Sequence, residues 1–247
     1  RALTGTGVAP ASITISDTPN YDFGTKAVGS TTDKTITLTN AGGITATSIS
    51  GGGLASPYSF KGGTFPGTGG NCTATLAASA NCTIVVTYAP IGTGVTSDNI
   101  DISYNNGVSG QNSSRQLDGT AVGPSVLTIS DGVTYNFGNV ANGSVNEKTF
   151  TVSNAASTFT ASAMGGSGLA APYLFKGGAY PGNGGTCSTT LAGGASCTIV
   201  VTFSPVASNT HNATISVDYN DGVGAQSATR AVTGISTAPA SLAMSNG

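Results

Sequence analysis

Four cysteines are the residues of this chain best suited to chemistry, and they form two pairs with one spacing. Cys72 and Cys82 stand as far apart as Cys187 and Cys197. Four cysteines allow three disulfide pairings, and the repeated spacing favours one bridge within each pair. A zinc site is the alternative, but its cysteines usually stand two to four residues apart. We predict the bridges Cys72–Cys82 and Cys187–Cys197, no metal, and an oxidising compartment such as the periplasm or the cell exterior.

Few other residues of the sequence could support catalysis. A Ser–His–Asp arrangement needs a histidine, and the single His211 lies in a polar run without a counterpart histidine in the first half of the chain. Asp98 and Asp101 could pair as carboxylates, but the second half does not keep them. The sequence contains neither a G-x-S-x-G elbow nor a G-x-x-x-x-G-K phosphate loop. We expect no enzymatic activity and no cofactor.

Calcium would need more oxygen ligands than the carboxylates supply. Asp17 recurs as Asp131, whereas Asp218 and Asp221 flank a predicted hairpin in the second half only. Because Ca²⁺ takes six or more oxygens, several of them from carboxylates, these aspartates predict no calcium site.

A glycine-rich loop that occurs twice is the best candidate for an interaction. It carries Lys61 and Phe65 in the first half, and Lys176 and Tyr180 in the second. Loops at the ends of β-sandwiches often carry binding sites. Three interpretations stay open: the aromatic ring packs on its own core, contacts a neighbouring module or chain, or stacks on an external ligand such as a sugar.

The whole chain shows the same duplication. SDTPNYDFG (16–24) returns as SDGVTYNFG (130–138), and NCTIVVTYAP (81–90) returns as SCTIVVTFSP (196–205). The offset is 114 residues at Phe23 and Phe137 and becomes 115 at the cysteines. Self-similarity on this scale indicates tandem domains, and each copy is long enough to bury its own core.

The arginines mark one repeat position seen three times. They are Arg1, Arg115 and Arg230, each opening the last strand expected in a module. Such a charge on an edge strand can discourage wrong sheet pairing. The alternative is a junction salt bridge to Asp17 or Asp131, so these five residues are candidates for contacts between repeats.

Period-two alternation predicts an all-β fold. The run 34–39 places Ile36 and Leu38 on one face, and its partner 148–153 keeps that phase. Asn-Gly and Asp-Gly dipeptides separate the apolar runs as tight turns do. We predict two tandem immunoglobulin-like Greek-key β-sandwiches of seven to nine strands each. The charged fraction is only 7% and the formal net charge is -2, which argues against nucleic acid as a partner, and no apolar run is long enough to span a membrane.

The order of these motifs resembles a known family. An FG turn (Phe23-Gly24, Phe137-Gly138) is followed by a strand ending in Asn40 or Asn154, then a cysteine, then C-T-I-V-V-T-[YF]-x-P and a closing L-x-G-T or V-x-G strand. This pattern is similar to bacterial immunoglobulin-like repeats of the choice-of-anchor D type, relatives of the abnormal-spindle/hydin domains. The resemblance implies stalks and spacers of secreted or surface proteins, without catalytic residues. The Gly-rich insert before Cys72 and Cys187 departs from the pattern.

These observations together predict a structural role. We expect a last strand of a preceding repeat at 1–9, Ig-like repeats at 10–123 and 124–238, and a first strand of a following repeat at 239–247. The expected function is a repeat segment of a secreted or cell-surface bacterial fibre, stalk or adhesin. The alternatives are a filament subunit joined head-to-tail to its own copies by β-strand addition, and a carbohydrate-binding module that uses the aromatic loops on a surface glycan or host ligand.

Overall fold

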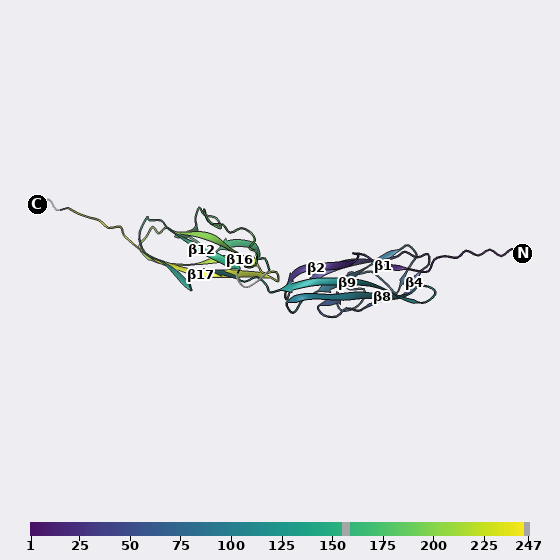
Figure 1. Ribbon diagram of the computed structural model, residues 1–247. Coiled ribbons are helices and arrows are strands. Elements are labelled where there is room, and N and C mark those ends of the chain that lie inside the picture. The colour runs from purple at the N-terminus through teal and green to yellow at the C-terminus, as the bar shows by residue number, and fades with distance from the viewer. Residues whose placement is uncertain (155–158, 245–247) are drawn as a thin grey trace. The chain divides into compact units, whose positions relative to one another are not determined.

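The computed structural model describes residues 1–154 and 159–244 and contains only strands and loops among them. The chain divides into two compact units, Arg1–Val122 and Gly123–Gly247, and Figure 1 shows strands layered in each. The described part has nine strands in the first unit and eight in the second. The prediction of two all-β, Ig-like sandwiches with seven to nine strands each is therefore confirmed. The part of the chain that the structure describes holds no helix able to cross a membrane.

The first unit consists of two facing sheets. One has the order β1-β3-β7-β5 and the other β2-β9-β8-β4-β6. Their bounds are β1 (Ile13–Ile15), β2 (Asn20–Ala27), β3 (Thr32–Asn40), β4 (Ala46–Gly52), β5 (Tyr58–Phe60), β6 (Thr75–Leu76), β7 (Asn81–Tyr88), β8 (Gly94–Asn105) and β9 (Gly110–Val122).

The second unit repeats this arrangement with the orders β10-β12-β15-β14 and β11-β17-β16-β13. Its strands are β10 (Leu127–Ile129), β11 (Thr134–Ala141), β12 (Asn146–Asn154), β13 (Ser162–Ser167), β14 (Tyr173–Phe175), β15 (Ser196–Phe203), β16 (Thr210–Asn220) and β17 (Ala225–Thr237). A bridge between Ala161 and Leu191 takes the place of the β4–β6 pairing.

Each core lies between its two sheets, where the alternating apolar residues meet. Ile36 and Leu38 are fully buried on β3, and Phe150 and Val152 are their counterparts on β12. Tyr58 and Tyr88 stack in the first core with ring centroids 4.9 Å apart. Burying such side chains contributes roughly 1.5–3 kcal/mol each, which is the main stabilisation that holds the two sheets together.

The segments expected to be strands at the two ends are not strands in this chain. Residues 1–12 and 238–244 form none, and residues 1–10 are exposed. The remainder of the 239–247 segment lies outside the described residues. Their assignment to flanking repeats stays a prediction.

Candidate functional site

In each unit, the chain passes from one sheet to the other at a sharp turn between the first and second strands, which we call the corner. β1 pairs antiparallel with β3, whereas β2 pairs parallel with β9 in the facing sheet. Asp17, between β1 and β2, has a φ of 63°, and Asp131 has a φ of 71° in the second unit. Left-handed backbone is uncommon for residues other than glycine, although aspartate tolerates it. Because the same uncommon conformation occurs in both units, the corner is a conserved element of the repeat within this chain.

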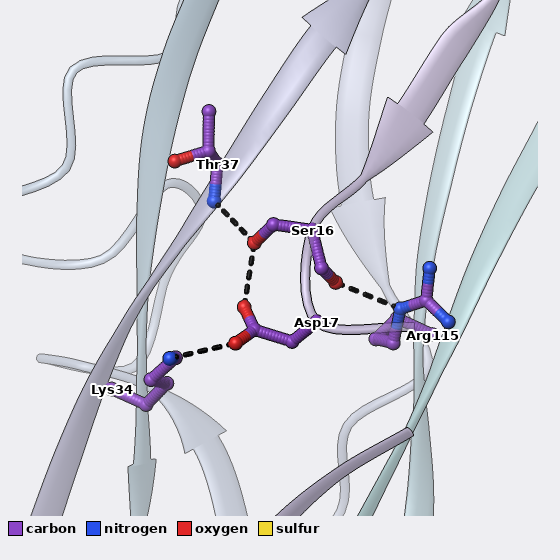
Figure 2. A network of polar contacts seen from close by, with 5 residues as sticks. All are labelled: Ser16, Asp17, Lys34, Thr37 and Arg115. Atoms are coloured by element: carbon purple, nitrogen blue, oxygen red, sulfur yellow. Dashed lines mark hydrogen bonds and ion pairs between the residues drawn. The ribbon is translucent and has the colours of Figure 1, made fainter. Parts of the chain in front are cut away.

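A carboxylate network closes the corner (Figure 2). Asp17 Oδ1 lies 2.8 Å from Lys34 Nζ, and its Oδ2 accepts a 2.6 Å hydrogen bond from Ser16 Oγ. The same Ser16 hydroxyl accepts the backbone N–H of Thr37 at 3.1 Å. The hydrogen bonds from Lys34 and then Ser16 hold the pKa of the Asp17 carboxyl below its ordinary value. The network therefore links the β1–β2 turn to β3.

Arg115 secures the same corner from the last strand. Its Nε donates to the Ser16 carbonyl at 2.9 Å, and an Nη atom donates to the Ile15 carbonyl at 2.7 Å. The other Nη donates to the carbonyl of Pro19. A guanidinium presents its donors in a rigid fork. One side chain on β9 therefore binds three carbonyls at the β1–β2 turn, about a hundred positions earlier in the sequence.

The second unit has an equivalent corner with fewer contacts from its arginine. Lys148 Nζ lies 2.8 Å from Asp131 Oδ1, and this bond raises the pKa of Lys148 while it lowers the pKa of Asp131. Ser130 Oγ donates to Asp131 at 2.6 Å. Arg230 donates to the Ile129 carbonyl, while its Nε is buried without a partner.

The arginine–aspartate salt bridge, which the sequence left open as an alternative, is not formed at either described corner. Asp17 and Asp131 each pair with a lysine of their own unit, and the arginines bind carbonyls there instead. The reason is geometric: β1 pairs with β3, so a β3 lysine lies closer to the turn carboxylate than the β9 arginine does. Arg1 lies in the exposed segment before β1.

Sequence reasoning missed Lys34 and Lys148, although both recur at the repeat offset. Each ammonium also lies over a tyrosine ring, 4.3 Å from the Tyr21 centroid and 4.7 Å from that of Tyr135. A cation over an aromatic face contributes about 0.5–1 kcal/mol at exposed sites. The recurrence of both partners was the signal that could have identified the pair.

The aromatic loops pack on their own units. Phe65 meets Phe60 edge-on with centroids 5.6 Å apart, and Tyr180 meets Phe175 at the same distance. A Cβ built on Gly51 would lie 2.3 Å from the Phe65 ring, so glycine there makes room for it. Of the three interpretations left open by the sequence, the structure matches packing on the own core.

The lysines of these loops are also engaged. Lys61 pairs with Asp33 at 2.7 Å, and Lys176 pairs with Glu147 at 2.8 Å. All four side chains are more than a third exposed. Such surface ion pairs contribute about 0–1 kcal/mol to stability. The pairs orient the loop over β3 and β12 more than they stabilise the fold.

Both predicted disulfides are present. Cys72 bonds to Cys82 and Cys187 bonds to Cys197, and no cysteine is free. Each bridge ties the glycine-rich loop to the start of β7 or β15. Disulfides persist in oxidising compartments, which indicates such an environment for this chain.

The other titratable candidates are held by separate partners. His211 Nε2 lies 3.1 Å from Ser236 Oγ, Asp98 accepts the N–H of Ala55 at 2.7 Å, and Asp101 accepts the Asn112 amide at 3.3 Å. Among the described residues, no three His, Cys, Asp or Glu side chains gather as a metal site would require.

Comparison with known proteins gives likeness of fold alone. No family model and no curated protein matches the chain. A protein of unknown function from Porphyromonas gingivalis W83 is 10% identical, with a TM-score of 0.36, over 89% of this chain and 98% of that one. The seventh PapD-like domain of human CEP192 is 18% identical, with a TM-score of 0.33, over 50% of this chain and 92% of its own. Titin domains I67–I69 are 8% identical, with a TM-score of 0.37, over 94% and 67%.

Proposed function

We propose that this chain is a non-catalytic, load-bearing repeat segment of a secreted or cell-surface bacterial fibre, stalk or adhesin. The observation that carries the proposal is the parallel pairing of β2 with β9, and of β11 with β17. The second strand of each module and its last strand are therefore hydrogen-bonded neighbours, while the three-residue first strand, β1 or β10, pairs in the other sheet. Tension along the chain would reach the parallel pair once this short first strand has separated from β3 or β12.

Parallel pairing decides how that tension acts. Parallel neighbours begin at the same end of the sheet, so pulling the start of β2 and the end of β9 apart slides one strand along the other. The two stretches of this ladder, Asn20↔Gln116 to Asp22↔Asp118 and Thr25↔Thr120 to Ala27↔Val122, are then loaded together, because the pull runs along the strands and across their hydrogen bonds. Arg115 holds the turn before β2 from β9 itself. The corner thus strengthens the connection that the load must break.

Two further features support a mechanical role outside the cytosol. Each module has its own disulfide, and the motif order resembles choice-of-anchor D repeats, which occur as stalks and spacers. The bridge between Cys72 and Cys82 shields the residues between them from extension. A chain built of such modules would set length and resist stretching, with neighbouring repeats as its main partners.

The structure offers little for β-strand addition or for carbohydrate binding through the aromatic loops. β-strand addition needs a regular edge, but the eight-residue β2 is broken by a register shift between Asp22 and Thr25. The shift contains Gly24 with a φ of 71°, the form of a bulge that blunts an edge. Carbohydrate binding through Phe65 and Tyr180 would need rings that now pack on their own cores.

Single-molecule pulling of the two-module chain tests the proposal. We expect two discrete unfolding events, and a reductant should lengthen each release by roughly 35 Å, since each bridge spans 10 positions at about 3.5 Å per residue. Arg115→Lys should lower the force of one event, while Arg1→Lys in the exposed segment should lower neither. Extension without discrete events, or an unchanged force in Arg115→Lys, would refute the load-bearing role.

A further inference from the structure

The same surface groove occurs in both units, at equivalent positions of the sheet that contains β9 or β17. In the first unit its lining includes Ser48, Ser103, Asn105, Gln111 and Asn112, around a volume of about 600 Å³. In the second unit the counterparts are Ala163, Asp218, Asn220, Gln226 and Ser227, around about 510 Å³. Both are open grooves on the surface of the sheet.

A bulge in the neighbouring strand, β4 or β13, accompanies each groove. The pairing of β4 with β8 shifts between Thr47 and Ser50, and that of β13 with β16 shifts between Ser162 and Gly165. The first residue inside each shift has a left-handed backbone, Ser48 with a φ of 53° and Ala163 with a φ of 51°. Left-handed backbone costs a non-glycine residue about 1 kcal/mol or more. Both units have a residue other than glycine at this position, although glycine would adopt the conformation without that energetic cost.

Each groove presents an amide whose orientation is fixed by the adjacent hairpin. Asn105 Oδ1 accepts the N–H of Gly107 at 2.8 Å, and Asn220 Oδ1 accepts that of Gly222 at 2.8 Å. Within the described residues, neither Nδ2 has an acceptor. Because the oxygen is committed to the turn, each NH₂ group is a positioned donor that only solvent or a ligand can use.

The lining chemistry identifies the class of ligand. Amides and hydroxyls line the first groove, with no charged side chain among them. The second contains one charge, Asp218, whose carboxylate accepts Ser167 Oγ at 2.7 Å and Ser216 Oγ at 2.8 Å. An anionic ligand would be repelled by Asp218 in the second groove and by Asp101, whose carboxylate accepts the Asn112 amide beside the first groove. A neutral compound rich in hydroxyl groups suits both.

We propose that the two grooves are equivalent binding sites for a neutral saccharide, one in each module, with the NH₂ groups of Asn105 and Asn220 donating to its oxygens. Binding there is separate from the load-bearing role, since no groove residue belongs to the corner network. A fibre built of such modules would carry one saccharide site per repeat, and many weak sites in series bind a glycan-covered surface strongly.

Asn→Asp substitutions test the sites without disturbing the hairpins, because Asp keeps the oxygen that the turn needs and loses the NH₂ donor. Asn106→Asp is the matched control. Asn106 lies next to Asn105, and its Oδ1 accepts the N–H groups of Val108 and Ser109. Asp221 performs the same turn role naturally in the second unit. The control therefore adds the same charge one residue away, outside the groove lining.

The experiment is an array of oligosaccharides of glucose, galactose, mannose and N-acetylglucosamine, with sialylated and sulfated glycans on the same slide, followed by calorimetric titration of the best neutral glycan. We expect two sites per chain. Asn105→Asp and Asn220→Asp should each remove one site, and the double variant should weaken binding at least tenfold, while Asn106→Asp changes nothing. No binding of any neutral glycan, binding of charged glycans alone, or two sites retained in both single variants would overturn the proposal.

Discussion

The side chain of Arg115 donates from Nε to the carbonyl of Ser16 over 2.9 Å, although the two residues are 99 positions apart. This bond joins the last strand of the module to the turn between β1 and β2. It gives the Ser16 carbonyl, just beyond the end of β1, a hydrogen-bond partner, and a buried polar group without a partner is costly. The corner is thus the point where both ends of the module are joined.

Replacing Arg115 should destabilise the first unit measurably. Arg115→Lys keeps the charge but replaces the planar fork with a single ammonium, so we expect a loss of about 1.5–3 kcal/mol in the free energy of unfolding. Chemical denaturation should show this as an earlier transition of one unit. Arg1→Lys, in the exposed segment, is the control and should leave both transitions in place. Equal effects of the two variants would contradict the role of the corner.

The corner carboxylates should make stability depend on pH. Folding lowers the pKa of Asp17 and Asp131 below 3.8, so the unfolded chain binds more protons between the two values and stability falls as pH drops. The contribution is complete above about pH 4–5 and is lost as pH falls through the folded pKa. Lys34→Met combined with Lys148→Met should therefore flatten the dependence of unfolding free energy on pH between about 2 and 5.

Lys26→Met is the control for this pH experiment. Lys26 lies on β2 with no ion pair or hydrogen bond from its side chain in the described part of the chain, so the substitution removes one positive charge, against two in the corner variant, without touching a carboxylate. The slope below pH 5 should then stay that of the unaltered protein. If Lys26→Met flattened the pH profile as much as the corner variant, the pH dependence would come from the overall charge of the protein and not from the corner carboxylates.

The elements of this fold could be read from the sequence, while the corner could not. Alternation at Ile36 and Leu38 requires only that one face be buried, and the cysteine spacing is local, so both predictions were confirmed. The Lys34–Asp17 pair depends on which strand β1 joins, since Ile15 lies opposite Leu38. That register is set by packing across the whole module, and periodicity carries no information about it.

The glycine-rich loops show a second limit of sequence reasoning. An aromatic residue on a glycine scaffold resembles an exposed platform, and the recurrence of Phe65 and Tyr180 fits binding and packing equally well. The deciding feature was Gly51, together with its counterpart Gly166, whose missing side chains admit the rings. These glycines lie on β4 and β13, in the sheet opposite the strand that leads into each loop, so the sequence alone did not connect them to the loop.

The difference between the two loops predicts opposite effects of a hydroxyl group. The Tyr180 hydroxyl is buried and has no hydrogen-bond partner among the described residues, and burial raises its pKa. Tyr180→Phe should be neutral or stabilise the second unit by about 1 kcal/mol, whereas Phe65→Tyr should destabilise the first by about 1–3 kcal/mol. Thermal unfolding of the two variants measures both, and a clear destabilisation by Tyr180→Phe would show that the hydroxyl is satisfied in solution.

Adding one methyl group at Gly51 should test the packing of the loop on its core. A Cβ there would lie 2.3 Å from the Phe65 ring and 2.6 Å from that of Phe60, so Gly51→Ala should cost about 1–3 kcal/mol through overpacking. At the adjacent Gly52 a Cβ meets nothing within 4 Å, which makes Gly52→Ala the matched control. Because the clash is with Phe65, Phe65→Leu should recover part of the loss, and a double-mutant cycle of unfolding free energies would measure the coupling. Additive effects of Gly51→Ala and Phe65→Leu would mean that the Phe65 ring does not pack against Gly51 in solution. The loop would then again be a candidate interaction surface.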